Sequence, residues 1–152
     1  MVNKLESYNE ATKELVILAE DYEIPKFGKY SLPEIVQALR ESFKYKLTYK
    51  KVFGDVIETE CNPSTGFCLI SSYYIYNSTG GKDTWTIMKN PVHWWLEHNI
   101  ISGPFDITYD QFNNISFPYR IKSKELRIPD NKIWTKDIYE KAMILGKCAG
   151  LE

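Results

Sequence analysis

The sequence predicts an α+β fold, in which helices flank a group of short strands that form an antiparallel sheet. In the N-terminal third of the chain and again near its C-terminus, apolar residues recur at the three- and four-residue spacing of a helix. Between these parts, segments rich in tryptophan, isoleucine and threonine alternate with turn residues, which is typical of strands.

Two helices are expected first. Residues 3–22 have the apolar spacing of an amphipathic helix. A second helix should begin at Ser31, because Ser31 and Glu34 match a capping box and Pro33 stands in the first turn. Residues 47–60 contain strand-forming side chains around a glycine, and we expect irregular or short extended structure there.

Residues 67–76 can be interpreted in two ways. Their side chains favour strands, but polar and apolar residues do not alternate, and capping residues stand just upstream. We predict a buried helix that ends near Asn77, with Gly80 and Gly81 as the turn after it.

Strands are expected next, over residues 85–88, 92–97 and 105–108, with turns around Pro91 and Pro104. Thr108 and Gln111 match a second capping box, so a short helix should follow. Residues 118–128 are predicted as a further strand and residues 135–147 as a closing helix.

Composition limits the classes of function. The chain has 152 residues, of which 43% are hydrophobic and 26% charged, and its net charge is −1. This balance gives no electrostatic reason to bind nucleic acid or an anionic membrane. An odd number of cysteines and the absence of an apolar leader or long apolar run predict a cytoplasmic protein with free thiols. Substrate, partner and oligomeric state stay open.

The candidate catalytic residues are Cys68, His93 and Asp106. A thiol becomes a good nucleophile when a neighbouring imidazole lowers its pKa, and a carboxylate can hold the other nitrogen of that imidazole. If a helix begins near Thr65, its first turn contains Cys68, where free backbone N–H groups stabilise a thiolate. Each residue also has a simpler interpretation: Cys68 as a small buried hydrophobe, His93 as a core residue and Asp106 as a turn or cap.

A developing oxyanion needs hydrogen-bond donors. The backbone N–H of Cys68 can supply one, and Asn62, Ser64 or Thr65 a second. Gln111 is interpreted as a helix cap and is included among the groups that could contact substrate or oxyanion.

A metal centre is the rival chemistry. Cys61, Cys68, His93 and Asp106 are ligand types that suit zinc. The spacing of the two cysteines is unlike the C-x-x-C of a compact zinc knuckle, so we favour the triad, which needs no cofactor or metal.

Several segments resemble the YunG-like family, a group of small bacterial proteins without an established activity. They are residues 35–43, 62–68, 80–81, 93–95 and 106–112. The resemblance covers about residues 33–115 and implies one α+β domain over residues 30–150, with residues 1–29 as an N-terminal helical extension. The order of cysteine, histidine and aspartate also looks like the papain, NlpC/P60 and transglutaminase superfold, which implies a papain-like core.

The arrangement suggests a papain-like cysteine hydrolase or acyltransferase. The chain departs from the family pattern at Phe67, where the family has glutamine, and at Leu96, where it has asparagine. Because both family residues are polar and adjoin the proposed chemistry, the alternative is a non-catalytic interaction or ligand-binding domain that keeps the fold.

Overall fold

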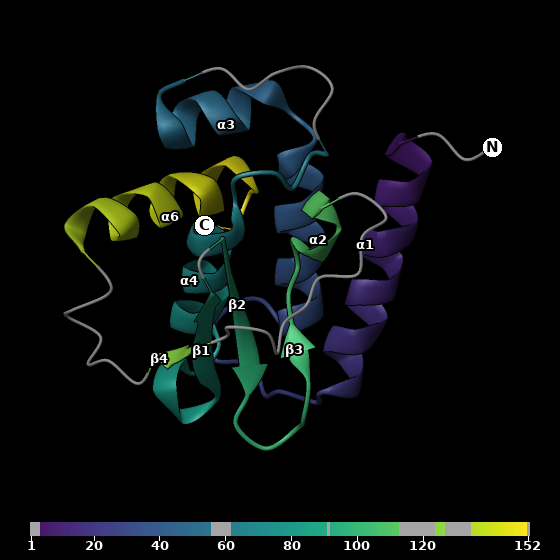
Figure 1. Cartoon of the computed structure of the whole chain (residues 1–152), viewed down its shortest axis with the longest axis vertical. Coiled ribbons are helices and arrows are strands. Elements are labelled where there is room, and N and C mark those ends of the chain that lie inside the picture. The colour runs from purple at the N-terminus through teal and green to yellow at the C-terminus, as the bar shows by residue number, and fades with distance from the viewer. Residues whose placement is uncertain (1–3, 56–61, 91, 113–123, 127–134, 152) are drawn as a thin grey trace.

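The computed structural model describes residues 4–55, 62–90, 92–112, 124–126 and 135–151. It confirms the α+β class (Figure 1). The helices are α1 (Lys4–Asp21), α2 (Leu32–Phe43), α3 (Lys46–Phe53), α4 (Cys68–Ser78) and α6 (Lys136–Cys148), with short 3-10 helices η1 (Gly81–Asp83) and η2 (Tyr109–Phe112). The strands are β1 (Trp85–Asn90), β2 (His93–His98), β3 (Pro104–Phe105) and β4 (Lys124–Leu126).

The strands form an antiparallel sheet in the order β3-β2-β1-β4. Ile87 pairs with Leu96, and Leu96 pairs with Phe105, so their side chains share one face. All three belong to the hydrophobic core, together with residues of α4, which packs on β2. The helix that begins with Cys68 therefore lies directly against the strand that begins with His93.

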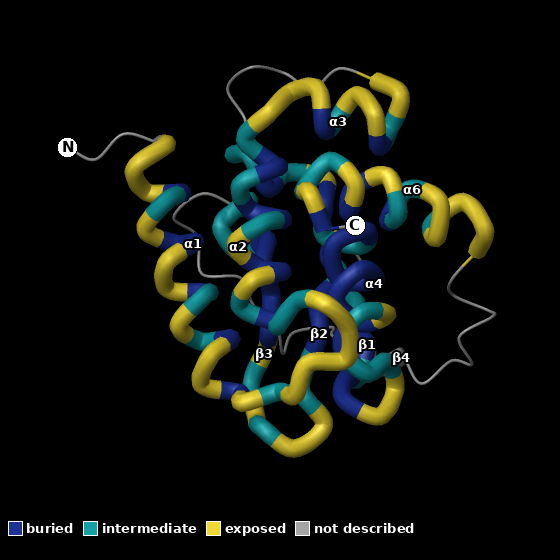
Figure 2. Tube along the Cα trace, turned by 180° about the vertical axis from the view of Figure 1, so that it is seen from behind, coloured by how far each residue is buried: buried dark blue, intermediate teal, exposed yellow. Residues whose placement is uncertain are grey.

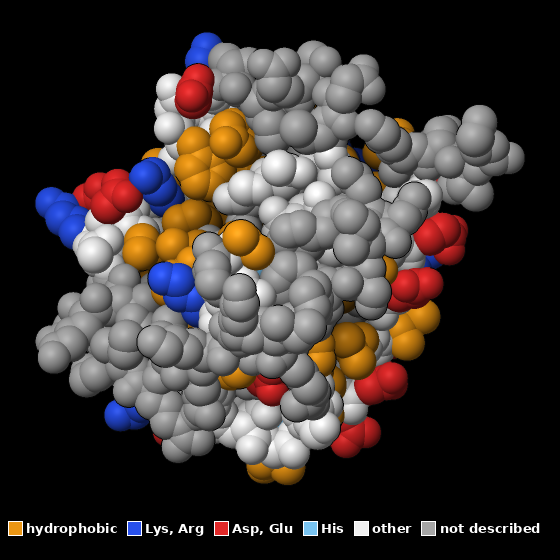
Figure 3. Space-filling model, in the orientation of Figure 1, with side chains coloured by type: hydrophobic (Ala, Val, Ile, Leu, Met, Phe, Trp, Pro, Cys, Tyr) orange, Lys and Arg blue, Asp and Glu red, His pale blue; other side chains and the backbone are white. Residues whose placement is uncertain are grey.

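Helices α1 and α2 lie side by side at the β3 edge of the sheet (Figures 1 and 2). Tyr8, Leu15 and Ala19 of α1 are buried in the same core as Val36 and Leu39 of α2. The opposite side of α1 faces outward, and acidic side chains gather along this edge (Figure 3). In the described part of the chain, every helix is too short or too polar to cross a lipid bilayer.

Side-chain caps explain where two of the helices begin. The capping box at α2 is confirmed: Glu34 N donates to Ser31 Oγ, and Ser31 N donates to Glu34 Oε1 at 2.9 Å. Helix α6 is capped in a similar way, by Thr135 Oγ1, which accepts from Ile138 N. Because these side chains satisfy backbone donors of the first turn, both helices begin where the sequence predicts.

The predicted helix over residues 67–76 is also confirmed, as α4. Its residues from Ile70 to Tyr76 are all buried, so the helix is dark along most of its length in Figure 2. Burial on all sides explains why the sequence shows no alternation of polar and apolar residues there.

The prediction for residues 47–60 was wrong over its described part, because α3 is a helix. Thr48 and Val52 are four residues apart and are buried on one face of this helix. Gly54 ends α3 at φ 74°, a left-handed conformation that glycine adopts without steric cost. The predicted strand over residues 105–108 stops at Phe105, and of residues 118–128 only those of β4 lie within the described residues.

Candidate active site

Cys68 is the first residue of α4 and is partly exposed. A tight turn precedes it, in which Phe67 N donates to Ser64 O and Gly66 has a φ of 87°. Phe67 occupies the N-cap position but offers no side-chain hydrogen bond to the first turn. The start of α4 therefore lacks the capping group that α2 and α6 have, and its positive end stands beside the thiol.

His93 begins β2 and is 1% exposed. Its Nε2 lies 2.6 Å from Oδ2 of Asp106, whose side chain is also buried. An ionised carboxylate only accepts hydrogen bonds, so Nε2 carries the proton and Nδ1 of the neutral ring is left as an acceptor. The indole of Trp95 stacks on the imidazole, with 5.9 Å between ring centroids and 19° between planes. The ring is therefore held at its edge and on its face.

The thiol of Cys68 lies close enough to the imidazole of His93 to favour its protonated form. Asp106 occupies Nε2, so we assign the contact with the thiol to Nδ1, beside which Nε2 of Gln111 also lies, at 3.1 Å. Burial opposes the imidazolium and lowers the pKa of His93, but hydrogen bonds to Asp106 and Cys68 and the negative charges of both raise it, to about 9 overall. This is the environment in which a proton moves from a thiol to an imidazole.

Asp106 is held by the turn that follows it. Its Oδ1 accepts from Thr108 N at 3.0 Å and from Thr108 Oγ1 at 3.1 Å. Gln111 Nε2 lies 3.2 Å from Thr108 Oγ1 and 3.1 Å from His93 Nδ1. These four side chains form a closed ring of hydrogen bonds. Sequence reasoning did not single out Thr108 for this ring, although an aspartate two residues before a threonine is a common pattern of Asx turns.

The predicted oxyanion residues fall into two groups. Asn62 Nδ2 donates to Asp110 O at 3.0 Å, and Ser64 Oγ lies 2.7 Å from Asn62 Oδ1 and 3.2 Å from Asp110 Oδ1. These contacts attach the loop before α4 to η2. Thr65 is half-buried in the same loop, whereas Gln111 touches His93 directly.

The structure adds a buried arginine that sequence reasoning missed. Arg40 of α2 is 0% exposed and forms a bidentate ion pair with Asp110, at 2.7 and 3.0 Å. A signal existed in the sequence, because Arg40 lies on the apolar face of α2 with Val36 and Phe43, and a charge on such a face needs a buried partner.

Phe67 and Leu96, the two departures from the family pattern, point into the core. The Phe67 ring stacks on Phe43, with centroids 4.3 Å apart, and lies 5.4 Å from the ring of Phe53. Leu96 is buried on the face of β2 opposite His93. Both are thus packing residues.

Three of the four suggested zinc ligands, Cys68, His93 and Asp106, lie within the described residues. Among the described residues, no group of three His, Cys, Asp or Glu side chains is placed to hold a metal ion. Cys61, the fourth suggested ligand, lies outside the described residues.

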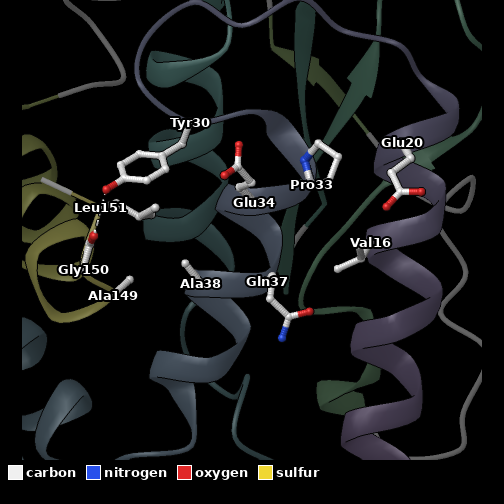
Figure 4. A pocket seen from close by; sticks show the side chains of 10 residues that line it. All are labelled: Val16, Glu20, Tyr30, Pro33, Glu34, Gln37, Ala38, Ala149, Gly150 and Leu151. Carbon is white, nitrogen blue, oxygen red and sulfur yellow. Dashed lines mark hydrogen bonds between the residues drawn. The ribbon is translucent and has the colours of Figure 1, made fainter.

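A groove of about 440 Å³ lies elsewhere on the molecule (Figure 4). Its walls come from α1, α2 and the residues after α6, and include Val16, Glu34, Gln37 and Leu151. The triad residues do not line this groove, so it has no part in the site described above.

Comparisons of the chain with protein-family models, curated proteins and solved structures found no match. The interpretation of the site therefore rests on its geometry and on the chemistry of its residues.

Proposed function

We propose that the protein is a cysteine hydrolase or acyltransferase acting on an amide, ester or thioester. One observation carries the proposal: Cys68 stands at the uncapped start of a helix beside His93, and Nε2 of His93 is held 2.6 Å from Oδ2 of Asp106. A helix bearing the cysteine that packs on the strand bearing the histidine also agrees with a papain-like core, as the resemblance implies. Membership of the YunG-like family remains part of this proposal.

Before the substrate is attacked, the proton of the Cys68 thiol has passed to Nδ1 of His93, which gives a thiolate–imidazolium pair. The thiolate attacks the carbonyl carbon of the substrate, and the carbonyl electrons move to oxygen. When the tetrahedral intermediate collapses, the bond to the leaving group breaks and the imidazolium returns its proton to the departing amine, alcohol or thiol. Water or another nucleophile, deprotonated by His93, then attacks the carbonyl carbon of the acyl group; the C–S bond breaks, and Cys68 leaves as a thiolate beside the protonated His93. Asp106 keeps the imidazole in its reactive tautomer throughout.

The oxyanion is stabilised by the backbone N–H of Cys68, in the first turn of α4. Gln111 is the best-placed second donor, because its Nε2 carries two protons and borders the imidazole. Once Nδ1 of His93 is protonated it no longer accepts from Gln111. The N–H of Gln111 that had donated to Nδ1 can then donate to the oxyanion. The contact of Gln111 Nε2 with Thr108 Oγ1 holds the amide in place.

The non-catalytic alternative receives no support from the two residues that suggested it. Phe67 and Leu96 pack in the core, so neither covers the thiol.

Differential alkylation tests the proposal. At mildly acidic pH, iodoacetamide should modify Cys68 faster than Cys61 or Cys148 by roughly tenfold or more, because only a pre-formed thiolate reacts well there. Peptide mass spectrometry resolves the three sites. Cys148 is the matched internal control, since it is also partly exposed. His93→Gln should slow the alkylation of Cys68 and leave the alkylation rates of the other two cysteines unchanged. Equally slow alkylation of all three cysteines in the parent protein would contradict the proposal.

A further inference from the structure

We propose that Arg40 is a positioning residue of this site, which sets the loop leading to Cys68 and the turn carrying Asp106 and Gln111 in one fixed register. The inference rests on the proposed function, because it assigns a role in the same cysteine chemistry. It is carried by the contacts of one buried side chain, described next.

The guanidinium of Arg40 has all five N–H groups engaged. Nε donates to Thr12 Oγ1 at 3.0 Å, and Nη2 donates to Tyr8 O at 2.9 Å, both on α1. Nη1 donates to Ile107 O at 2.8 Å, and each terminal nitrogen donates to one carboxylate oxygen of Asp110. The aromatic ring of Tyr8 lies 3.8 Å from the guanidinium carbon. With contacts on every side, the group can take only one orientation.

One set of contacts leads to the nucleophile. Asp110 Oδ1, which accepts from Arg40, also lies 3.2 Å from Ser64 Oγ, and Asp110 O accepts from Asn62 Nδ2. Ser64 O in turn accepts from Phe67 N, one residue before Cys68. The position of the thiol is therefore tied to that of Asp110.

A second set of contacts leads to the base. Ile107, whose carbonyl accepts from Arg40, directly follows Asp106, the residue that holds His93 Nε2. Gln111, which lies against His93 Nδ1, directly follows Asp110. Arg40 thus touches the segment that holds both nitrogens of the imidazole, and through Asp110 it fixes the loop that presents the thiol.

Stability alone is a weak reason for such an ion pair. Buried ion pairs lose hydration, and apolar side chains of similar volume often stabilise a fold equally well. The pair instead fixes the relative orientation of Arg40 and Asp110, because a guanidinium and a carboxylate meet in a planar, two-point contact. That property suits a site in which the distance between thiol and imidazole must be set closely.

Two variants test the inference, with one control. Arg40→Lys keeps the charge but cannot form the bidentate contact. Ser64→Ala removes a hydroxyl that contacts both Asn62 Oδ1 and Asp110 Oδ1, and leaves the contact of Asn62 Nδ2 with Asp110 O in place. Val36→Ala, a core truncation on the same helix, is the control for lost stability. Each protein is assayed by the rate of Cys68 alkylation relative to Cys148, by its melting temperature, and by an NMR titration of His93 with His98 as internal reference.

We expect Arg40→Lys to slow Cys68 alkylation by about tenfold to a hundredfold, the effect of a displacement of about 1 Å. Its His93 titration should move down toward that of an ordinary histidine, while His98 titrates as before. Ser64→Ala should slow Cys68 by a smaller factor, and Val36→Ala should lower the melting temperature without changing either chemical measurement.

The outcomes separate the two proposals. If folded Arg40→Lys and Ser64→Ala keep the parental alkylation rate and His93 titration, Arg40 has no positioning role although the proposed function stands. If Cys68 of the parent reacts no faster than Cys148, the proposed function fails, and the His93 titration alone decides whether Arg40 positions the His93–Asp106 pair. If Arg40→Lys does not fold, an unchanged Cys68 rate in Ser64→Ala overturns the inference and a slower rate supports it.

Discussion

Asp106 Oδ2 lies 2.6 Å from His93 Nε2, although the two residues do not stand opposite each other in the sheet. The β2–β3 pairing joins Leu96 with Phe105, and continuing it places Asp106 opposite Trp95. Asp106 is therefore a diagonal neighbour of His93 on the same face, within reach of a long side chain. Because the contact is made diagonally, the carboxylate meets only the Nε2 edge of the imidazole, and Nδ1 lies instead against Gln111 Nε2, 3.1 Å away.

Asp106→Asn should reduce the alkylation rate of Cys68 by at least about tenfold, because a neutral amide neither supports the imidazolium nor selects its tautomer. The melting temperature should change little, since asparagine can still accept from Thr108 through its side-chain oxygen. The NMR titration of His93 should shift to lower pH. Asp137→Asn, which removes a carboxylate from an exposed ion pair with Lys141, is the control for the change in net charge. A variant that labels like the parent would reduce Asp106 to a turn residue.

The free energy of unfolding should depend on pH through His93. Its folded pKa of about 9 lies above the ordinary histidine pKa of 6.5, so protonated His93 stabilises the fold fully below pH 6.5. This contribution, of about 3 kcal/mol at most, should be lost as pH rises through 9. Urea titrations across this window measure it, and the drop should be absent from His93→Gln.

His98 provides a comparison of opposite sign. Burial lowers its pKa in the folded state, so its neutral form stabilises the fold above the unfolded pKa, and that stability is lost as pH falls. The neutral Nδ1 accepts from the backbone N–H groups of Ile100 and Ile101, which protonation would prevent. His98→Gln should therefore change how the free energy of unfolding varies at acidic pH. The loss of stability at basic pH, which depends on His93, should be unchanged.

Phe67→Ala should lower the free energy of unfolding by about 3–5 kcal/mol, because it opens a cavity among packed rings. In the folded fraction, Cys68 should still react faster than Cys148, since Phe67 faces the core and not the thiol. Phe27→Ala, at a site that is 56% exposed, is the control and should change stability by no more than about 0.5 kcal/mol. Unchanged stability in Phe67→Ala would contradict the packing described above.

The helices that could be predicted are those whose signals come from residues close together in the sequence. Apolar periodicity and capping boxes located α1, α2 and α6, because those signals act within one or two turns of a helix. Helix α3 was missed because its own residues favour extended structure, and it packs against α6, which lies far away in the sequence. Tertiary contact overrides local preference in such a segment.

The residues of the candidate site also divide into those that the sequence predicts and those that only tertiary contacts reveal. Cys68, His93 and Asp106 could be proposed from residue chemistry and order, because a thiol, an imidazole and a carboxylate have few joint uses. The roles of Arg40 and Asp110 depend on contacts between segments that only the fold brings together. No local pattern specifies which carboxylate a buried arginine will meet.

The arginine cluster also bears on the order of folding. Arg40 joins residues from both ends of a long stretch of chain, from Tyr8 to Asp110. Contacts of such sequence separation require the closure of long loops, which is slow and costly in entropy, so we expect this cluster to form late. Helix α4 and its thiol are synthesised before His93, Asp106 and Asp110. Whatever reactivity Cys68 gains from its neighbours therefore arises only when the fold is complete, and chains that are still folding carry an ordinary thiol.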